Sequence, residues 1–168
     1  MKRMVAICLT GLCLMTGAAQ NYTLHKEHDS LYSLRWRADS SLPPEGCSSG
    51  WRLPYPVYQF QTGDVDGDGS EDAMVGVVKA TRFYPEKARR LFIFKQVNGK
   101  VRPMWLGSKL GGILEDFRYV SGRIRALEST TDSLYVVAEY QWKGFGMGFD
   151  HYIIKGTDKE TAIKYFEQ

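Results

Sequence analysis

The chain has 168 residues, of which 43% are hydrophobic and 24% are charged, so it can bury a core and is too apolar to be disordered. Its formal charge is only +3, which excludes the dense positive surface that nucleic-acid phosphates require, and no nucleic-acid partner is expected. Aromatic residues make up 13%, a content that favours β-strands, where flat side chains pack well on a pleated surface.

The N-terminus has the three parts of a secretory signal. Residues 1–4 carry two basic side chains, residues 5–15 form an apolar run, and residues 17–19 supply the small side chains that a signal peptidase reads. The apolar run is too short for a membrane span, which takes about 20 residues. We therefore expect residues 1–19 to be a cleaved signal peptide of bacterial type. The mature chain would begin at Gln20, be periplasmic or secreted, and have no membrane span.

Cysteine usage agrees with this prediction and adds a constraint. The two cysteines of the signal region each follow a large aliphatic residue, whereas lipoprotein signals place a small residue there, so a lipid anchor is the less favoured alternative. Cleavage would leave Cys47 alone, and one cysteine cannot form an internal disulfide. The fold must then be held by its core and, we expect, by a metal ion.

The mature chain divides into a short polar segment and a longer β domain. Residues 20–50 are polar, with one alternating strand at 31–36 and proline-, glycine- and serine-rich loop chemistry after it. Residues 51–168 are expected to form the β domain.

Strand and turn signals alternate along this domain. Strands are predicted at residues 55–61, 73–80, 91–96, 101–106, 117–120, 123–127, 134–142 and 149–154. Asn98-Gly99 predicts a type I′ hairpin turn, because both central residues then need positive φ, and Ser121-Gly122 predicts a second tight turn. Residues 85–89 are compatible with one helical turn or a polar loop. Residues 157–168 are compatible with a last strand or a short helix whose cap is Thr157 or Asp158.

The predicted strands fall into two groups of about four, at residues 55–106 and 117–154. Each group has the length of a propeller blade, roughly 40–50 residues, but two blades cannot close a propeller, which takes about 4–8. We therefore predict a mostly β fold, in which an antiparallel meander of two propeller-blade-like four-strand groups forms a curved sheet, a sandwich or a partly closed barrel.

The segment 63–72 reads Gly-Asp-Val-Asp-Gly-Asp-Gly-Ser-Glu-Asp and has the composition of a calcium loop. Counted from Asp64, aspartates stand at positions 1, 3, 5 and 9, and glycines at positions 4 and 6. Calcium takes roughly 6–8 oxygen ligands, and four aspartates this close would repel one another without a cation. The alternative is a solvated acidic turn with no ion. The expected ligands are Asp64, Asp66, Asp68, the carbonyl of Ser70, and Asp72, directly or through water.

This loop is not predicted to be an EF-hand. Position 12 is Val75, where an EF-hand has a bidentate glutamate, and predicted strands flank the loop in place of helices. The segment instead resembles the FG-GAP/VCBS-type repeat, in which a strand runs into Gly-Asp-x-Asp-x-Asp-Gly-x-x-Asp and a second apolar strand leaves it. The resemblance covers about residues 55–80. It implies calcium binding and blade-like β structure, and it does not specify a function. Repeats of this family usually occur in series, whereas this chain has one clear copy.

Aromatic residues surround the glycine-rich segment 144–148. Tyr140, Trp142 and Phe145 are the candidate ligand-binding residues, because exposed aromatic faces stack on sugar rings or anchor a protein partner. The alternative is that these side chains fill a small β core.

The sequence assigns no catalytic residue. His25 and His28 could offer two ligands to a transition metal, but no third is apparent, and His151 is predicted to be structural or exposed. Glu115 and Asp116 are adjacent, so on a strand they would face opposite sides. No Ser/His/Asp or Cys/His set can be assembled.

Three functional hypotheses follow. The favoured one is an exported, calcium-stabilised β-module that binds a glycan or a protein. The second is an extracytoplasmic enzyme acting on polysaccharide, with calcium near its cleft. The third is a structural or assembly protein, in which an open sheet edge pairs with another chain to form an oligomer.

Overall fold

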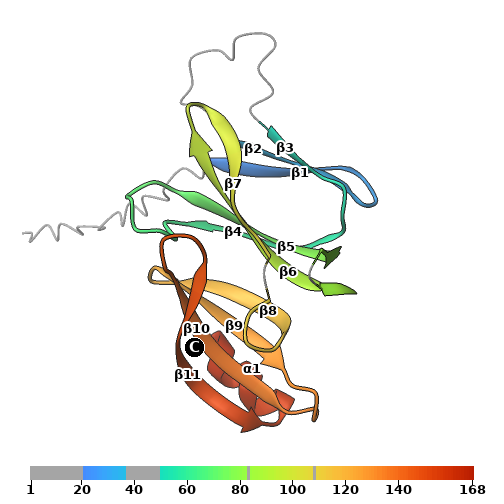
Figure 1. Ribbon diagram of the computed structural model, residues 1–168, viewed down its shortest axis with the longest axis vertical. Helices are drawn as coiled ribbons and strands as arrows, with labels where there is room; N and C mark the ends of the chain where they lie inside the picture. Colours follow the sequence, from blue (N-terminus) through green and yellow to red (C-terminus); the bar gives the residue numbers. More distant parts are fainter. Residues whose placement is uncertain (1–20, 37–49, 83, 108) are drawn as a thin grey trace, which may run out of the picture.

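The structure is a computed structural model that describes residues 21–36, 50–82, 84–107 and 109–168 (Figure 1). The predicted signal peptide and Cys47 lie outside these residues and stay predictions. No helix of the described ranges is long and apolar enough to cross a membrane.

The described residues form three antiparallel sheets and a helix. The N-terminal sheet contains β1 (Tyr22–His28), β2 (Leu31–Trp36) and β3 (Gly50–Leu53). The central sheet contains β4 (Val57–Gly63), β5 (Asp72–Thr81), β6 (Tyr84–Val97) and β7 (Lys100–Leu106). The C-terminal sheet contains β8 (Ile113–Val120), β9 (Arg123–Ser129), β10 (Tyr135–Trp142) and β11 (Met147–Thr157), and helix α1 (Lys159–Glu167) follows it.

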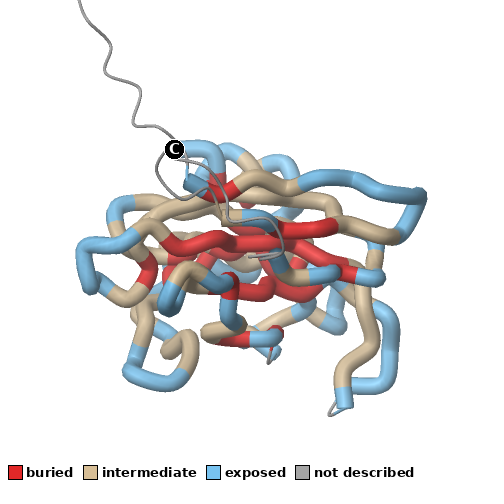
Figure 2. Tube along the Cα trace, turned by 90° about the horizontal axis from the view of Figure 1, so that it is seen from above, coloured by how far each residue is buried: buried red, intermediate tan, exposed pale blue. Residues whose placement is uncertain are grey.

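The three sheets stack face to face in chain order, and α1 covers the far side of the C-terminal sheet (Figure 1). Alternation along β5 shows why the central sheet lies in the middle. Val75 and Val77 pack toward the N-terminal sheet, and Met74 packs toward the C-terminal sheet. Seen from above, buried positions run through the middle of the strands, and exposed positions gather at the turns (Figure 2). A strand covered on both faces must be continuously apolar, as residues 73–78 are.

The predicted fold class is confirmed. Both four-strand groups are sequential meanders, with strand orders β4-β5-β6-β7 and β11-β10-β9-β8, and the described sheets do not close into a barrel. Asn98 (φ 52°) and Gly99 (φ 73°) form the turn between β6 and β7 in the conformation expected of a type I′ turn.

The N-terminal sheet goes beyond the sequence prediction, which placed one strand there. β1 leaves four of its seven residues exposed, so it lacks the apolar alternation that identifies a strand. Its anchor is Tyr22, which is fully buried against the central sheet.

Residues 85–89 form neither a helical turn nor a loop; they belong to β6. This part of β6 extends beyond the end of β7 and pairs with β5 alone. Ala88 opposes Lys79, and Arg89 opposes Val78. A two-stranded ribbon with solvent around it can be polar, and this is why its composition resembles a loop.

The helical alternative for the C-terminus is confirmed, with Asp158 as its N-cap. The Asp158 carboxylate accepts the backbone N–H of Thr161 at 2.9 Å. Ala162 and Phe166 then pack on Leu127 and Val137 of the C-terminal sheet, which buries the face of that sheet away from the central sheet.

Candidate metal centre

The acidic loop joins two adjacent strands of the central sheet. β4 ends at Gly63 and β5 begins at Asp72, so the intervening residues must reverse the chain. Gly67 (φ 77°) and Gly69 (φ 84°) both lie in the left-handed region, which other residues enter only at a cost. The glycine spacing of the motif therefore has a direct backbone explanation.

The Asp64 carboxylate organises the loop from inside. Its Oδ1 accepts the backbone N–H of Gly67 at 2.7 Å and of Asp68 at 3.1 Å, and its Oδ2 accepts that of Gly69 at 2.9 Å. The N–H of Ser70 donates to Asp68 Oδ1 at 2.8 Å. These bonds curl the loop so that alternate carboxylates converge.

Three carboxylates form the candidate site. Single oxygens of Asp64, Asp66 and Asp72 lie within 4.8 Å of one another. Asp72 is fully buried; its Oδ2 accepts the N–H of Val65 at 2.9 Å, but its Oδ1 has no hydrogen-bond partner among the described residues. Burial, and then the nearby carboxylates of Asp66 and Asp68, raise the pKa of Asp72 to about 6. A buried carboxylate oxygen without a partner is costly and calls for a cation or a proton.

A lysine from β6 reaches the outer side of this cluster. Lys95 Nζ lies 2.6 Å from Asp66 Oδ2 and 2.9 Å from Asp68 Oδ2. These contacts raise the pKa of Lys95, and the lysine is the main cause that lowers the pKa of Asp68. Sequence reasoning missed Lys95 because it lies 27 residues beyond Asp68. The only available signal was strand pairing, since Phe94 opposes Ala73 at the start of β5.

The structure therefore brings together part of the predicted ligand set. Asp64, Asp66 and Asp72 converge, whereas Asp68 lies outside this group and is engaged by Lys95 and Ser70. The oxygen-only donors and the partnerless Asp72 oxygen fit a hard cation such as calcium. Asp68 could join such a site after it separates from Lys95.

The base of the loop is fixed against the C-terminal sheet. Val65 is buried in the core between the two sheets, and the Tyr119 hydroxyl donates to the Asp64 carbonyl at 2.8 Å. A Cβ atom at Gly63 would stand 2.3 Å from the Tyr119 ring. Glycine is thus required at the end of β4 for this ring to approach the backbone.

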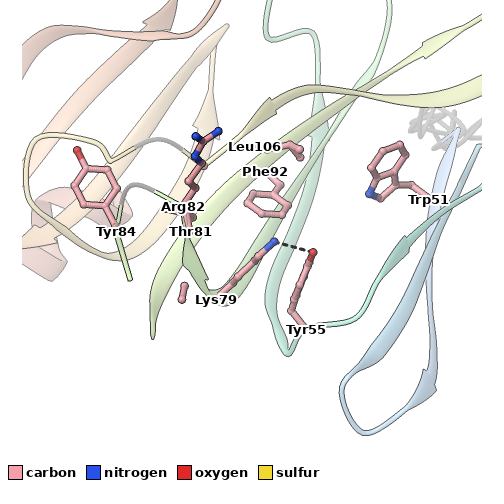
Figure 3. Close-up of a pocket in the computed structure, with 10 residues that line it drawn as sticks. Trp51, Tyr55, Lys79, Thr81, Arg82, Tyr84, Phe92 and Leu106 are labelled. Atoms are coloured by element: carbon pink, nitrogen blue, oxygen red, sulfur yellow. Dashed lines mark hydrogen bonds between the residues drawn. The ribbon is translucent and has the colours of Figure 1, made fainter. Parts of the chain in front are cut away.

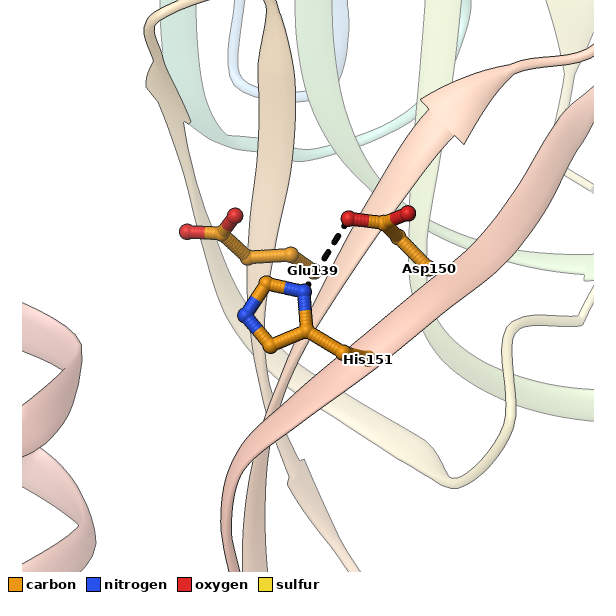
Figure 4. A group of neighbouring side chains, drawn as sticks. All are labelled: Glu139, Asp150 and His151. Carbon is orange, nitrogen blue, oxygen red and sulfur yellow. Dashed lines mark hydrogen bonds and ion pairs between the residues drawn. The ribbon is translucent and has the colours of Figure 1, made fainter.

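A second acidic group lies on the C-terminal sheet, where Glu139, Asp150 and His151 approach one another (Figure 4). Arginines neutralise it. Arg125 contacts Glu139 Oε1 at 2.9 Å, and Arg123 contacts Asp150 Oδ2 at 3.1 Å. A metal ion would have to displace these cations, so the group is best described as an ion-pair network that joins β9, β10 and β11.

The three candidate ligand-binding aromatics occupy different environments. Tyr140 is 3% exposed, and its hydroxyl donates to the buried Glu128 carboxylate at 2.8 Å. Trp142 is partly buried against the core between the central and C-terminal sheets. Phe145 is 92% exposed at the tip of the β10–β11 hairpin. Ligand binding by these residues stays a prediction, and Phe145 has the most accessible ring.

Comparison of the chain with protein-family models, curated proteins and solved structures finds no match.

The contact between Gly63 and Tyr119 predicts a large cost for one added methyl group. We expect Gly63→Ala to lower the free energy of unfolding by about 1–3 kcal/mol, because the ring or the loop must move. Gly146→Ala is the matched control, since its Cβ would meet the Trp105 ring no closer than 3.4 Å. Urea denaturation of both variants measures the difference, and equal losses would contradict the role given to Tyr119.

Proposed function

We propose that this protein is an exported β-module, stabilised by calcium in the loop 64–72, that binds a glycan or a protein. Calcium would be held by Asp64, Asp66 and Asp72, with Asp68 and the carbonyl of Ser70 completing the shell. The observation that carries this proposal is the fully buried Asp72, whose Oδ1 faces no hydrogen-bond donor.

The charge balance of the loop favours a divalent ion. Asp64, Asp66, Asp68, Glu71 and Asp72 carry −5 when all are ionised, and Lys95 contributes +1, which leaves −4. A calcium ion would reduce this to −2. Within the part of the chain that the structure describes, Lys95 bonds Asp66 and Asp68 and not the buried oxygen of Asp72.

The place of the loop in the fold indicates a structural role for the ion. The loop closes the β4–β5 hairpin, and Val65 and Tyr119 anchor it at the junction of two sheets. A cation there would hold the hairpin end where no disulfide is expected to do so. A loop between two apolar strands of a four-stranded sheet is also what the resemblance to the FG-GAP/VCBS-type repeat implies, and this supports the proposal.

Exposed aromatic rings on the last hairpin support the binding role. Phe145 is 92% exposed, Phe149 49% and Tyr152 50%, and the centroids of Phe149 and Tyr152 lie 4.7 Å apart. These three residues are the hairpin aromatic surface. Rings that remain exposed to water offer a platform for a sugar ring or a partner side chain.

Calcium should raise the melting temperature of the mature protein. With a dissociation constant typical of extracellular modules, about 0.1–1 mM, calcium at about 1 mM adds roughly 0.4–1.4 kcal/mol, or a rise of about 1–5 °C. Asp72→Asn should abolish this rise, because asparagine keeps the size of the side chain and loses its charge. Asp132→Asn, at an exposed turn, should respond as the wild type does. A calcium-insensitive wild-type melting curve would refute the proposal.

Lys95 should compete with calcium for two of its ligands. Lys95→Met keeps most of the aliphatic side chain and removes the ammonium that bonds Asp66 and Asp68. We expect this variant to melt at a lower temperature without calcium, and to bind calcium about tenfold more tightly, since no cation must be displaced. Isothermal titration calorimetry measures the change. An unaltered dissociation constant would show that Lys95 and the ion do not share these oxygens.

The hairpin aromatic surface should determine ligand binding. In affinity electrophoresis through gels that contain a panel of polysaccharides, we expect at least one to retard the wild type and Phe145→Ala with Phe149→Ala to reduce that retardation by about tenfold in affinity. Tyr165→Ala, at a partly exposed position on α1, is the control. Retardation that survives the double substitution would move the glycan site elsewhere. If no polysaccharide retards the protein, glycan binding is contradicted, and a protein ligand remains as the proposal.

A further inference from the structure

A cavity of about 420 Å³ opens between the N-terminal and central sheets (Figure 3). Four aromatic residues line it: Trp51 on β3, Tyr55 in the connection to β4, and Tyr84 and Phe92 on β6. β5 begins in the acidic loop and ends at the cavity with Thr81. Its ten residues, at about 3.3 Å each, place the acidic loop and the cavity about 30 Å apart. The volume is in the range of small-molecule sites.

The lining of this cavity is cationic. Lys79 and Arg82 contribute to it, and none of the described residues that line it is acidic. Lys79 Nζ donates to the Tyr55 hydroxyl at 2.8 Å and lies 4.2 Å from the centroid of the Tyr55 ring. The Phe92 centroid is 5.8 Å from the same nitrogen. The ammonium is thus held over two aromatic rings at the centre of the site.

The contacts of Lys79 leave room for an anion. An ammonium has three N–H donors, and the Tyr55 hydroxyl accepts one of them. Within the described ranges no carboxylate lies at ion-pair distance from Lys79, although the residue is half-buried. Contact with ring faces compensates a charge only partly. A carboxylate from a ligand would supply the missing countercharge.

We propose that this cavity binds a small carboxylate carried on a six-membered ring. The carboxylate pairs with Lys79, and the ring packs against the aromatic side chains of the lining. Acidic sugars and aromatic acids share this chemistry. The cavity includes neither the acidic loop nor the hairpin aromatic surface, so ligand binding here is independent of the proposed function.

Titration of the ¹⁵N-labelled mature protein, followed by amide chemical shifts, tests the proposal. The probes are methyl β-D-glucuronide, benzoate, and methyl β-D-glucoside, which matches the glucuronide without its charge. We expect one or both anions to shift the amides of residues 79–82 and of Gly107, and the glucoside to leave them unchanged. Tighter binding of the glucuronide assigns an acidic sugar, and tighter binding of benzoate assigns an aromatic acid. Shifts with neither anion, or equal binding of the glucoside, would overturn the proposal.

Substitutions distinguish specific binding of the anion at Lys79 from nonspecific attraction of anions to any exposed lysine. Lys79→Met keeps the aliphatic contact with the rings and should weaken binding of the preferred anion about tenfold, whereas Lys79→Arg should restore most of it. Lys155→Met is the matched control, because Lys155 also lies over a tyrosine, 5.3 Å from the Tyr152 centroid, and is outside the cavity. Equal weakening by Lys79→Met and Lys155→Met, or none by either, would overturn the assignment of the anion to Lys79.

Discussion

Burial of the central sheet on both faces is the constraint on which the rest of the molecule depends. Phe92 and Phe94 of β6 pack toward the N-terminal sheet, while Leu91 and Ile93 pack toward the C-terminal sheet. Neither outer sheet could bury its inner face without this layer, and the C-terminal sheet needs α1 to cover its other face. The middle parts of β5 and β6, which pair with each other at the centre of the molecule, therefore have no polar face. Polar side chains on these strands are confined to the strand ends.

The same constraint explains how a buried carboxylate arises. Asp72 is the first residue of β5, so it enters the core with the strand and is fully buried, while the rest of the loop stays near solvent. Lys95 reaches the cluster because β6 continues past the point where β5 begins. The site thus combines a local motif with one residue placed by pairing of distant strands.

This division marks what sequence can predict. Asn98-Gly99 and Asp158 act locally, through positive φ and through a cap on the next turn; the turn was predicted from the sequence, and Asp158 was one of the two candidate caps. The acidic spacing also acts locally: it predicted that the loop aspartates converge, and Asp64, Asp66 and Asp72 do, whereas Asp68 lies outside the group. Lys95 and Tyr119 act across strand pairs and between sheets, and no local pattern identifies them. The burial of Tyr140 likewise depends on which face of β10 meets the central sheet.

The two ends of β5 carry opposite electrostatic demands. At one end, the buried Asp72 carboxylate has an oxygen that Lys95 does not contact. At the other end, Lys79 lies over aromatic rings, and no carboxylate of the described residues is at ion-pair distance from it. Over about 30 Å, well beyond a Debye length of about 8 Å, these charges scarcely interact through solvent. The strand between them is packed on both faces and cannot slide without losing that packing. On the two proposals, a cation bound at the loop would act on stability, and an anion bound at the cavity would be free to serve recognition.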